Sequence, residues 1–333
     1  MMNFCTLFDS HYLSRGIAMY ESLSASCPDF RLYIFAFDDV CYEYLAQKNL
    51  PNVILISLKE FEDEELLAVK ADRSKGEYCW TCTPSTVLYC LKKYNLPLCT
   101  YIDADLYFYS NPEVLLEEMG DSSILITEHR YTPEYDQSKT SGIYCVQFIA
   151  FKNDHYGLEA LTWWRNACLA WCYARYEDGK FGDQKYLDDW TDRFKKVHVL
   201  KHLGGGIAPW NVQQYQFSLS DGRISGVEIN HNEKFSAIFY HFHNLKFFPG
   251  DKIELGGYFL SPAVKEFFYK PYISYLLKVE NKINSNMEFA GKINSISPVN
   301  NDWKMPLRRI MQKIKKSYNR YDVKQFMETK WLK

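Results

Sequence analysis

The sequence lacks the features of exported and membrane-spanning proteins. Its first residues carry no basic stretch followed by an apolar run, so no signal peptide is predicted. No hydrophobic segment approaches the roughly 18 apolar residues of a membrane-spanning helix, because acidic residues, lysine or proline interrupt each one. We therefore expect a cytoplasmic protein, whose 333 residues allow one large or two modest domains.

Cysteine is present, but it lacks the spacing of a zinc site. The ten cysteines are scattered, and the close pairs Cys79 with Cys82 and Cys168 with Cys172 have no second pair at matching distance. We predict buried, reduced thiols. Compositional bias is also missing: 47% hydrophobic and 24% charged residues are ordinary for a globular protein and exclude wholesale disorder, collagen-like repeats and coiled coil.

The net charge of −2 conceals a strongly basic tail. Residues 304–333 hold ten Lys or Arg and two acidic residues, so the rest of the chain is acidic. Apolar residues recur on one face of a predicted helix in this tail: Leu307, Ile310, Met311, Ile314 and Tyr318. A basic amphipathic helix either lies on an anionic membrane or packs on its own domain. We favour the membrane, at the inner face, and expect no nucleic-acid partner.

Short apolar runs alternate with helical patterns in the first half of the chain. Strands are predicted at residues 3–8, 31–37, 53–57, 100–102 and 123–127. Helices are predicted from Leu13, over 41–48, over 83–94 with Pro84 near the first turn, and from Asn111-Pro112. This βαβαβ order predicts an α/β fold with a mostly parallel sheet covered by helices.

One domain boundary is predicted. Beyond Pro262 the pattern turns helical, and after residues 296–298 it becomes basic. We therefore expect a main domain over residues 1–261 and a helical C-terminal region over residues 262–333.

Acidic residues follow four of the predicted strands: Asp9, Asp38, Asp103 with Asp105, and Glu128. Open α/β sheets bind their ligands beyond the carboxyl ends of the strands, so one shared site is expected there. Asp103 and Asp105 point to the same side of a strand, because successive side chains alternate. Two such hard oxygen ligands suit Mg²⁺ or Mn²⁺ rather than zinc. A cation there is able to hold a diphosphate and to neutralise its developing charge.

A family resemblance begins at this acidic pair. Residues 101–108, YIDADLYF, resemble the metal motif of glycosyltransferases with the GT-A fold. The order of the other motifs, over roughly residues 3–250, is similar to the glycogenin-like family, glycosyltransferase family eight, in a divergent bacterial-type branch. The resemblance implies a Rossmann-like, nucleotide-sugar-binding fold with a mixed, mostly parallel central sheet. It also implies metal-dependent transfer of a hexose from a UDP-sugar, with retention of the anomeric configuration.

The resemblance implies nucleotide contacts. Residues 4–9 resemble the opening strand whose end holds the uracil base, which assigns Phe8, Asp9 and Tyr12 to the nucleotide. Ala104, inside the metal motif, and Ser141, which opens a segment that ends at residue 153 beside the donor sugar, are assigned to the donor in the same way.

A late motif implies the third metal ligand and a phosphate ligand. Residues 241–246, HFHNLK, resemble a motif in which His completes the metal site and Lys holds the diphosphate, which assigns Lys246. The motif is one residue shorter than usual, and Asn244 stands in place of Gly. Either His241 or His243 is therefore the metal ligand, and alignment favours His241.

Gly182-Asp183-Gln184 resembles the segment that the family places near the anomeric carbon, so Asp183 and Gln184 are assigned to catalysis. Negative or dipolar groups there stabilise an oxocarbenium-like transition state. The alternative is that Asp183 caps the helix predicted over residues 184–190.

Three further segments are less specific. Glu128 either contacts a sugar or belongs to a salt-bridged loop. Trp210 either stacks on the acceptor or belongs to the core. Residues 204–206, GGG, predict a turn at which the backbone approaches the substrate.

The prediction is a metal-dependent glycosyltransferase, with a glycan or lipid-linked glycan acceptor, in bacterial surface polysaccharide synthesis. The alternatives are a nucleotide-sugar hydrolase or nucleotidyltransferase with the same metal site, and a non-catalytic glycan- or nucleotide-binding module.

Overall fold

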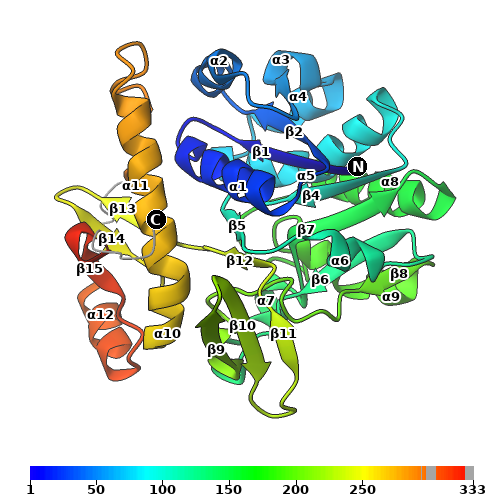
Figure 1. Cartoon of the computed structure of the whole chain (residues 1–333). Coiled ribbons are helices and arrows are strands. Elements are labelled where there is room, and N and C mark those ends of the chain that lie inside the picture. The colour runs from blue at the N-terminus through cyan, green and yellow to red at the C-terminus, as the bar shows by residue number, and fades with distance from the viewer. Residues whose placement is uncertain (294, 298–304, 327–333) are drawn as a thin grey trace.

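A seven-stranded sheet forms the centre of the computed structural model (Figure 1), which describes residues 1–293, 295–297 and 305–326, without the side chains of 305–308. The strand order is β3-β2-β1-β4-β7-β6-β8. The strands are β1 Met2–Phe8, β2 Phe30–Ala36, β3 Val53–Ser57, β4 Leu98–Ile102, β6 Ile124–Glu128, β7 Tyr144–Lys152 and β8 Val197–Val199. Only β7 runs antiparallel to its neighbours, so the predicted mixed, mostly parallel sheet is confirmed.

Helices cover both faces of this sheet, because alternate side chains of each strand enter different cores. In β1, Phe4 and Phe8 belong to one core and Cys5 and Leu7 to the other. The first core is covered by α1 Leu13–Ser26 and α2 Asp39–Lys48. The second is covered by α3 Leu58–Phe61, α4 Glu64–Lys70, α5 Lys75–Lys93, α8 His155–Ala170 and α9 Trp190–Arg193.

Helix α5 is longer than its sequence pattern predicts. It starts after a capping box in which the Ser74 side chain and the Glu77 side chain each bind the other residue's backbone N–H. Pro84 therefore lies inside the helix, and its expected place near the first turn is wrong. Pro84 has no backbone N–H, so one helical hydrogen bond is absent. Burial of Cys82 and Val87 against the sheet compensates for this loss and stabilises the helix.

Short strands extend the fold below the sheet in Figure 1. β5 Leu106–Phe108 pairs antiparallel with β12 Phe239–His241. An antiparallel sheet of β9 Tyr215–Ser220, β10 Arg223–Glu228 and β11 Lys234–Ser236 protrudes beside them. The smaller helices are α6 Glu113–Glu117, α7 Ser138–Ser141 and the 3₁₀ segments Pro133–Tyr135, Gln184–Asp189 and Val212–Gln214.

The triple glycine lies in close contact with neighbouring parts of the chain: Gly204 with backbone, Gly205 and Gly206 with side chains. A Cβ at Gly204 would clash with the Ser236 carbonyl oxygen, and Gly206 has φ +101°. The Gly204 carbonyl accepts hydrogen bonds from the backbone N–H groups of Ile238 and Phe239. Gly204 thus lets the turn lie close to the segment that joins β11 to β12. The predicted approach of the turn to a substrate stays a prediction.

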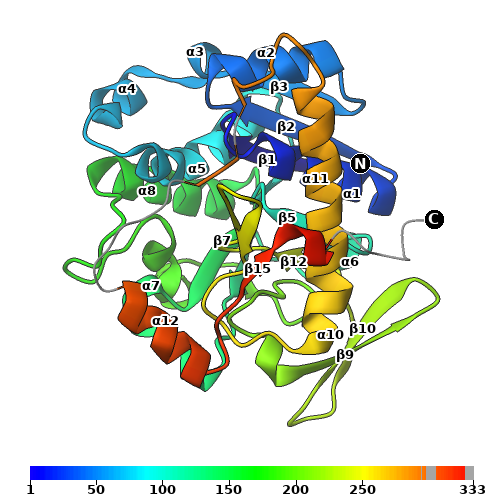
Figure 2. The ribbon, with the colours of Figure 1, turned by 90° about the vertical axis from the view of Figure 1, so that its left-hand side faces the viewer.

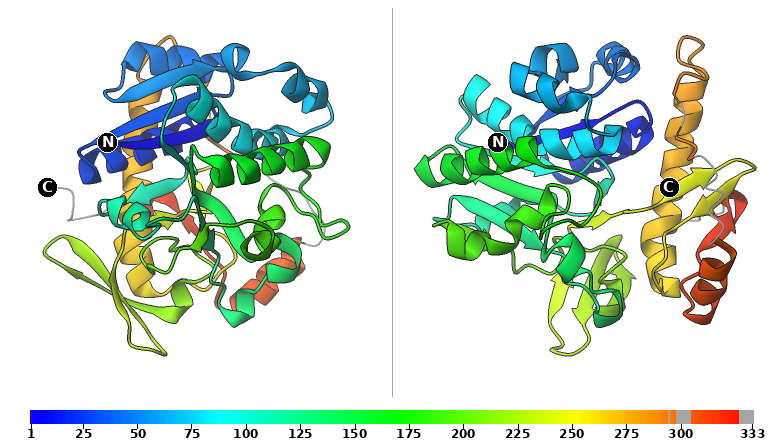
Figure 3. Two further views of the ribbon diagram at one scale, coloured as in Figure 1. Left: turned by 90° about the vertical axis from the view of Figure 1, so that its right-hand side faces the viewer. Right: turned by 180° about the vertical axis from the view of Figure 1, so that it is seen from behind.

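The C-terminal region contains a long helix and a small sheet at one side of the molecule (Figure 2). Its helices are α10 Pro262–Val264, a π-helical turn Lys265–Tyr269, α11 Lys270–Asn284 and α12 Met305–Ile314, and a short 3₁₀ segment, Val323–Phe326, follows. β14 Lys252–Glu254 pairs with both β13 Lys246–Phe248 and β15 Arg320–Asp322, so strands from both sides of residue 262 share one sheet. From behind, α11 and α12 lie to one side of the central sheet (Figure 3), and Val279 and Ile283 of α11 belong to the core on one face of that sheet. The division at residue 262 stays a prediction.

No helix among the described residues has the length and apolar character needed to span a membrane.

Candidate active site

Two aspartates and one histidine singled out by the sequence converge at the carboxyl end of the central sheet. Asp103 and Asp105 lie in the turn between β4 and β5, and His241 ends β12. The His241 Nε2 lies 3.1 Å from an Asp105 oxygen and 3.7 Å from an Asp103 oxygen. One ligand atom from each residue fits within 4.8 Å of the other two. The carboxylates are 27% and 13% exposed, so the group is reachable from solvent.

Strand pairing brings these distant residues together. In the β5–β12 ladder His241 lies opposite Leu106, directly after Asp105. The Phe242 N–H donates to the Asp105 carbonyl, 3.1 Å away, and the Asp103 N–H donates to the Gln147 carbonyl on β7, 3.0 Å away. The turn is therefore held from β12 on one side and from β7 on the other.

Gln147 orients the histidine, and the sequence analysis did not identify it. It is completely buried, and its side-chain oxygen accepts a hydrogen bond of 2.7 Å from His241 Nδ1. This bond turns Nε2 toward the two carboxylates. The only sequence signal was its position: Gln147 is the polar residue within the apolar run of β7.

The charges of the group depend on one another. Burial raises the pKa of Asp103 to about 6. Burial also opposes ionisation of Asp105, but the adjacent His241 ring outweighs it and lowers the pKa of Asp105. Burial would lower the pKa of His241, yet the aspartates raise it well above its usual value. Without a metal, a protonated His241 thus neutralises part of the aspartate charge. Two carboxylates and an imidazole are donors that Mn²⁺ or Mg²⁺ accept, so the set fits a divalent cation.

His243 and Trp210 form the wall beside this group. The Asn244 side chain donates to His243 Nε2 at 2.7 Å, and His243 is not one of the three converging residues. The Trp210 ring packs edge-on against both imidazoles, with centroids 5.4 Å from His241 and 5.3 Å from His243. Trp210 is only 4% exposed and donates its indole N–H to the His129 carbonyl, which favours the core alternative over stacking on an acceptor.

His129 follows Glu128 in the segment that the sequence predicts to contact a sugar or to form a salt-bridged loop. Its ring is buried, stacks on Tyr131 at 4.6 Å and meets Trp210 at 5.2 Å. Burial lowers the pKa of His129 to about 3, so the ring is neutral. Glu128 ends β6, and the structure shows no bond that links it to the metal-binding group among the described residues.

Asp183 lies near the group, whereas Gln184 is tied elsewhere. Burial and the charge of Asp103 raise the pKa of Asp183 to about 7. Asp183 is the N-cap residue of the 3₁₀ segment Gln184–Asp189, as the helix-cap alternative predicts, but its side chain makes no capping hydrogen bond. The segment is fixed by Trp164, whose indole N–H donates to the Asp183 carbonyl at 2.9 Å. The Gln184 amide donates to the Ser141 carbonyl at 2.5 Å, which joins two predicted site residues.

The residues predicted to bind the nucleotide base lie where the chain passes from β1 to α1. The Asp9 side chain accepts the backbone N–H groups of His11 and Tyr12, at 3.0 and 3.2 Å. Tyr12 is 40% exposed. Phe8 is 3% exposed and its ring packs against Gly16. Its contact with the nucleotide stays a prediction.

The remaining predicted residues differ in exposure. Ala104 is buried, at 7% exposed. Asp38 caps α2 and accepts hydrogen bonds from Ser10, which gives it a structural role. Lys246 is exposed at the start of β13, and its charge contributes to lowering the pKa of His243, so it lies near the same wall.

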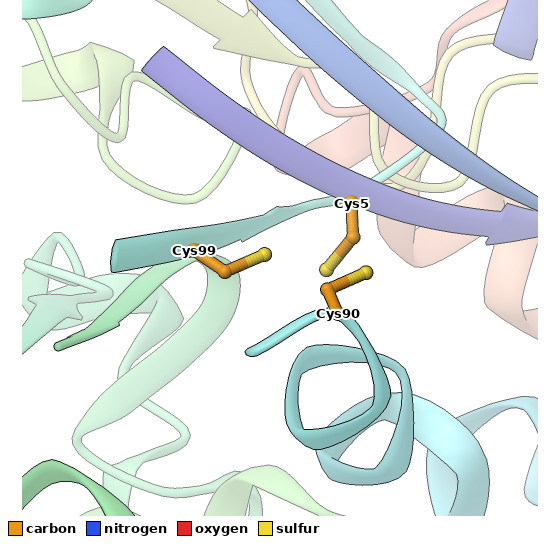
Figure 4. A group of neighbouring side chains, drawn as sticks. All are labelled: Cys5, Cys90 and Cys99. Carbon is orange, nitrogen blue, oxygen red and sulfur yellow. The ribbon is translucent and has the colours of Figure 1, made fainter. Parts of the chain in front are cut away.

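A second group of potential metal ligands lies in the core, away from this site (Figure 4). The thiols of Cys5 on β1, Cys90 on α5 and Cys99 on β4 converge within 4.8 Å and are fully buried. Burial raises the pKa values of Cys90 and Cys99 well above the usual range. Burial also opposes ionisation of Cys5, but hydrogen bonds with Cys90 and Cys99 outweigh it and lower the pKa of Cys5 to about 5. All ten cysteines are free, which fits the predicted reduced thiols.

Comparison with known proteins identifies relatives of this chain. No family model matches it. The chain is 30% identical over 289 residues to the uncharacterised protein YfnD of Bacillus subtilis (strain 168), covering 85% of this chain and 91% of YfnD. It is 32% identical over 247 residues to the uncharacterised protein YfnF of the same organism, covering 72% of this chain and 80% of YfnF.

A solved structure shares the fold. The galactosyltransferase LgtC, in complex with donor and acceptor sugar analogues, matches with a TM-score of 0.50 and 12% identity, over 91% of this chain and 99% of LgtC. LgtC has the GT-A fold, as the sequence resemblance implies for this chain. The chain therefore belongs to the family of the Bacillus proteins YfnD and YfnF, and its fold is GT-A.

Proposed function

We propose that the protein is a metal-dependent glycosyltransferase that moves a hexose from a UDP-sugar to a glycan or lipid-linked glycan acceptor. The observation that carries the proposal is the convergence of Asp103, Asp105 and His241 at the carboxyl end of a GT-A sheet. The LgtC structure was obtained with donor and acceptor sugar analogues, which is the reaction class proposed for this chain.

Asp103, Asp105 and His241, rather than His243, would hold Mn²⁺ or Mg²⁺. Such a cation neutralises charge on the departing diphosphate. Lys246, which is exposed at the start of β13, is proposed to bind the same diphosphate. Asp9, Tyr12 and Ala104 would contact the nucleotide. Ser141 would contact the donor near its sugar.

Asp183 is proposed to face the anomeric carbon. Its carboxylate is near Asp103 and little exposed, so a negative charge there acts strongly on an oxocarbenium-like transition state. Gln184 would act with it through its amide dipole. By resemblance to family eight, the acceptor oxygen attacks from the face that the diphosphate leaves. The C–O bond to the diphosphate breaks, the new C–O bond forms, and a phosphate oxygen takes the acceptor proton.

The acceptor is proposed to lie at the inner face of the cell membrane, in surface polysaccharide synthesis. Helix α12 exposes three apolar side chains, Ile310, Met311 and Ile314, at 56%, 57% and 76%. Lys313 and the following Lys315 and Lys316 add positive charge. Apolar exposure beside basic residues suits a peripheral contact with anionic lipid. Glu128 is proposed to contact the acceptor.

Thermal unfolding with a nucleotide panel tests the function. UDP, GDP, CMP and TDP are each added with Mn²⁺, Mg²⁺ or a chelator. We expect stabilisation by UDP that requires the metal, of about 2.7 kcal/mol when the ligand is at 100 times its dissociation constant. Asp105→Asn should abolish this stabilisation. Asp121→Asn, which changes an exposed aspartate outside the site, is the control and should not. If none of the nucleotides stabilises the protein, the transferase assignment is contradicted and a binding module is favoured.

A second assay separates transfer from hydrolysis. UDP-hexoses are incubated with Mn²⁺, with and without a lipid-linked glycan fraction, and UDP release is measured. Release that depends on the acceptor supports transfer. Equal release without it would assign the site to a nucleotide-sugar hydrolase.

A further inference from the structure

Arg15 is a buried cation that none of the roles above uses. It lies in the first turns of α1 and is 3% exposed. Among the described side chains no carboxylate lies within ion-pair distance of it: Asp103 and Asp105 pair with His241, and the Arg15 charge only contributes to lowering the pKa of Asp105 from farther away. Burial of a guanidinium without a paired charge costs folding free energy, so we looked for other contacts that stabilise it.

The guanidinium joins two segments that are 230 residues apart in the sequence. Its Nη2 donates to the Leu245 carbonyl at 3.0 Å, directly before Lys246. Its central carbon lies 4.8 Å from the centre of the Tyr12 ring and 5.9 Å from that of the Phe247 ring. Nη1 is buried without a hydrogen-bond partner. One side chain therefore supports both Tyr12 and the start of β13.

These two segments are the ones assigned to opposite ends of the nucleotide. Tyr12 is 40% exposed, so the guanidinium packs on one part of the ring and leaves another part open. Lys246 is exposed beside the carbonyl that Arg15 holds. A cation behind an aromatic ring orients it, and a hydrogen bond to the carbonyl limits movement of the strand start.

We propose that Arg15 is a positioning residue for the nucleotide: it sets the distance between Tyr12, under the base, and Lys246, at the diphosphate. This inference rests on the proposed function. Arg15 touches neither base nor phosphate, and its effect passes through Tyr12 and the Leu245 carbonyl. Preorganisation of both contacts lowers the ordering cost of binding.

Nucleotide affinity tests this role. UDP binding in the presence of Mn²⁺ is measured by calorimetry for the full chain and for Arg15→Leu, and Mn²⁺ binding without nucleotide is measured by electron paramagnetic resonance. We expect Arg15→Leu to weaken UDP about tenfold or more, in line with a lost cation–π contact and hydrogen bond. Its Mn²⁺ affinity should not fall, because the lost positive charge opposed cation binding. Arg15→Lys should recover part of the UDP affinity.

A control variant and a double-mutant cycle complete the test. Arg165 is also a buried arginine, but it pairs with Asp63, just before α4, and with Glu65 on α4. Arg165→Leu should leave UDP affinity unchanged. In a Tyr12→Leu background, the Arg15 substitution should cost less than it does alone, because part of its effect passes through Tyr12.

The outcomes separate the two proposals. Unchanged UDP affinity in Arg15→Leu, or a loss that is as large in the Tyr12→Leu background as in the unsubstituted chain, overturns the role of Arg15. If the unsubstituted chain binds no UDP, the proposed function fails instead. If Arg15→Leu does not fold, the same cycle is measured with Arg15→Lys, for which a partial loss coupled to Tyr12 is required.

Discussion

The histidine of the candidate site works through its neighbours. His241 faces two aspartates with one ring nitrogen and Gln147 with the other. Such an outer contact fixes the ring and the tautomer of a metal-binding histidine. The sequence motif identified His241 and left His243 open, but it contained no information about Gln147, which lies 94 residues away. The residue that orients a ligand is thus harder to find than the ligand.

Removal of the Gln147 acceptor should weaken metal binding. We expect Gln147→Leu to lower Mn²⁺ affinity about 10- to 100-fold, because the His241 ring loses the partner that aims its Nε2. Electron paramagnetic resonance of free and bound Mn²⁺ measures this. Gln147→Glu keeps an acceptor oxygen and should retain most of the affinity. Equal Mn²⁺ affinity in Gln147→Leu and the unsubstituted chain would contradict the orienting role.

Asp183 should make the metal-free protein less stable at high pH. Burial raises its pKa from 3.8 to about 7, so the folded state binds the proton more tightly than the unfolded state. Stability should therefore fall as the pH rises from about 4 to 7 and stay low above that.

Asp183→Asn should remove this dependence. At pH 8 it should raise the free energy of unfolding by a few kcal/mol, since one pKa unit corresponds to about 1.4 kcal/mol, and the gain should vanish near pH 4. Urea unfolding of the metal-free proteins at both pH values measures it. The exposed Asp121→Asn serves as control. A gain that is the same at both pH values would refute a charge effect.

Among the secondary-structure elements, the site depends on contacts that lie between strands. β12 reaches the acidic turn because β5 pairs with it and because the Gly204 carbonyl binds the chain just before it. The amino-acid sequence predicts most elements of the central sheet, since apolar runs and capping residues are local signals. It did not predict the length of α5, because packing against the sheet compensates for Pro84.

A side chain at Gly204 should damage the fold and the site together. Gly204→Ala drives a Cβ into the Ser236 carbonyl oxygen, so β11 must shift. We expect a loss of about 1–3 kcal/mol of stability in urea unfolding, typical of overpacking. Weaker Mn²⁺ binding should accompany it, because the displaced segment leads to His241.

Gly76 provides the matched control. It lies on α5, and a Cβ there meets nothing within 4 Å. Gly76→Ala should therefore be neutral or slightly stabilising. Full stability of Gly204→Ala would show that the turn adapts freely.

Across the molecule, charge is divided between an acidic body and a basic tail. The tail carries ten Lys or Arg between residues 304 and 333, and α12 exposes apolar side chains beside them. The predicted helix is confirmed as far as Ile314: Ile310, Met311 and Ile314 lie on α12 and are exposed, whereas Tyr318 lies beyond the end of α12. Leu307 lies outside the residues whose side chains the structure describes.

The tail should bind anionic vesicles. We expect sedimentation with phosphatidylglycerol vesicles and not with phosphatidylcholine vesicles, and salt should weaken it because screening reduces the attraction. Ile314→Glu should lower the bound fraction several-fold. The exposed apolar residue Leu67, on α4, gives a control in Leu67→Glu, which should bind as the unsubstituted chain does. Equal binding to both vesicle types would refute the electrostatic contact.

The fold class and the acidic pair follow from local patterns in the amino-acid sequence. Period-two and period-3.6 patterns reveal strands and helices, and two aspartates two residues apart share a face whatever the rest of the chain does. The folded molecule was needed to show which histidine meets them, that Gln147 aims it, and that Arg15 lies behind Tyr12. These contacts join residues that are far apart in the chain, except for Arg15 and Tyr12. They depend on strand register and side-chain packing, which are properties of the assembled molecule and leave no local pattern.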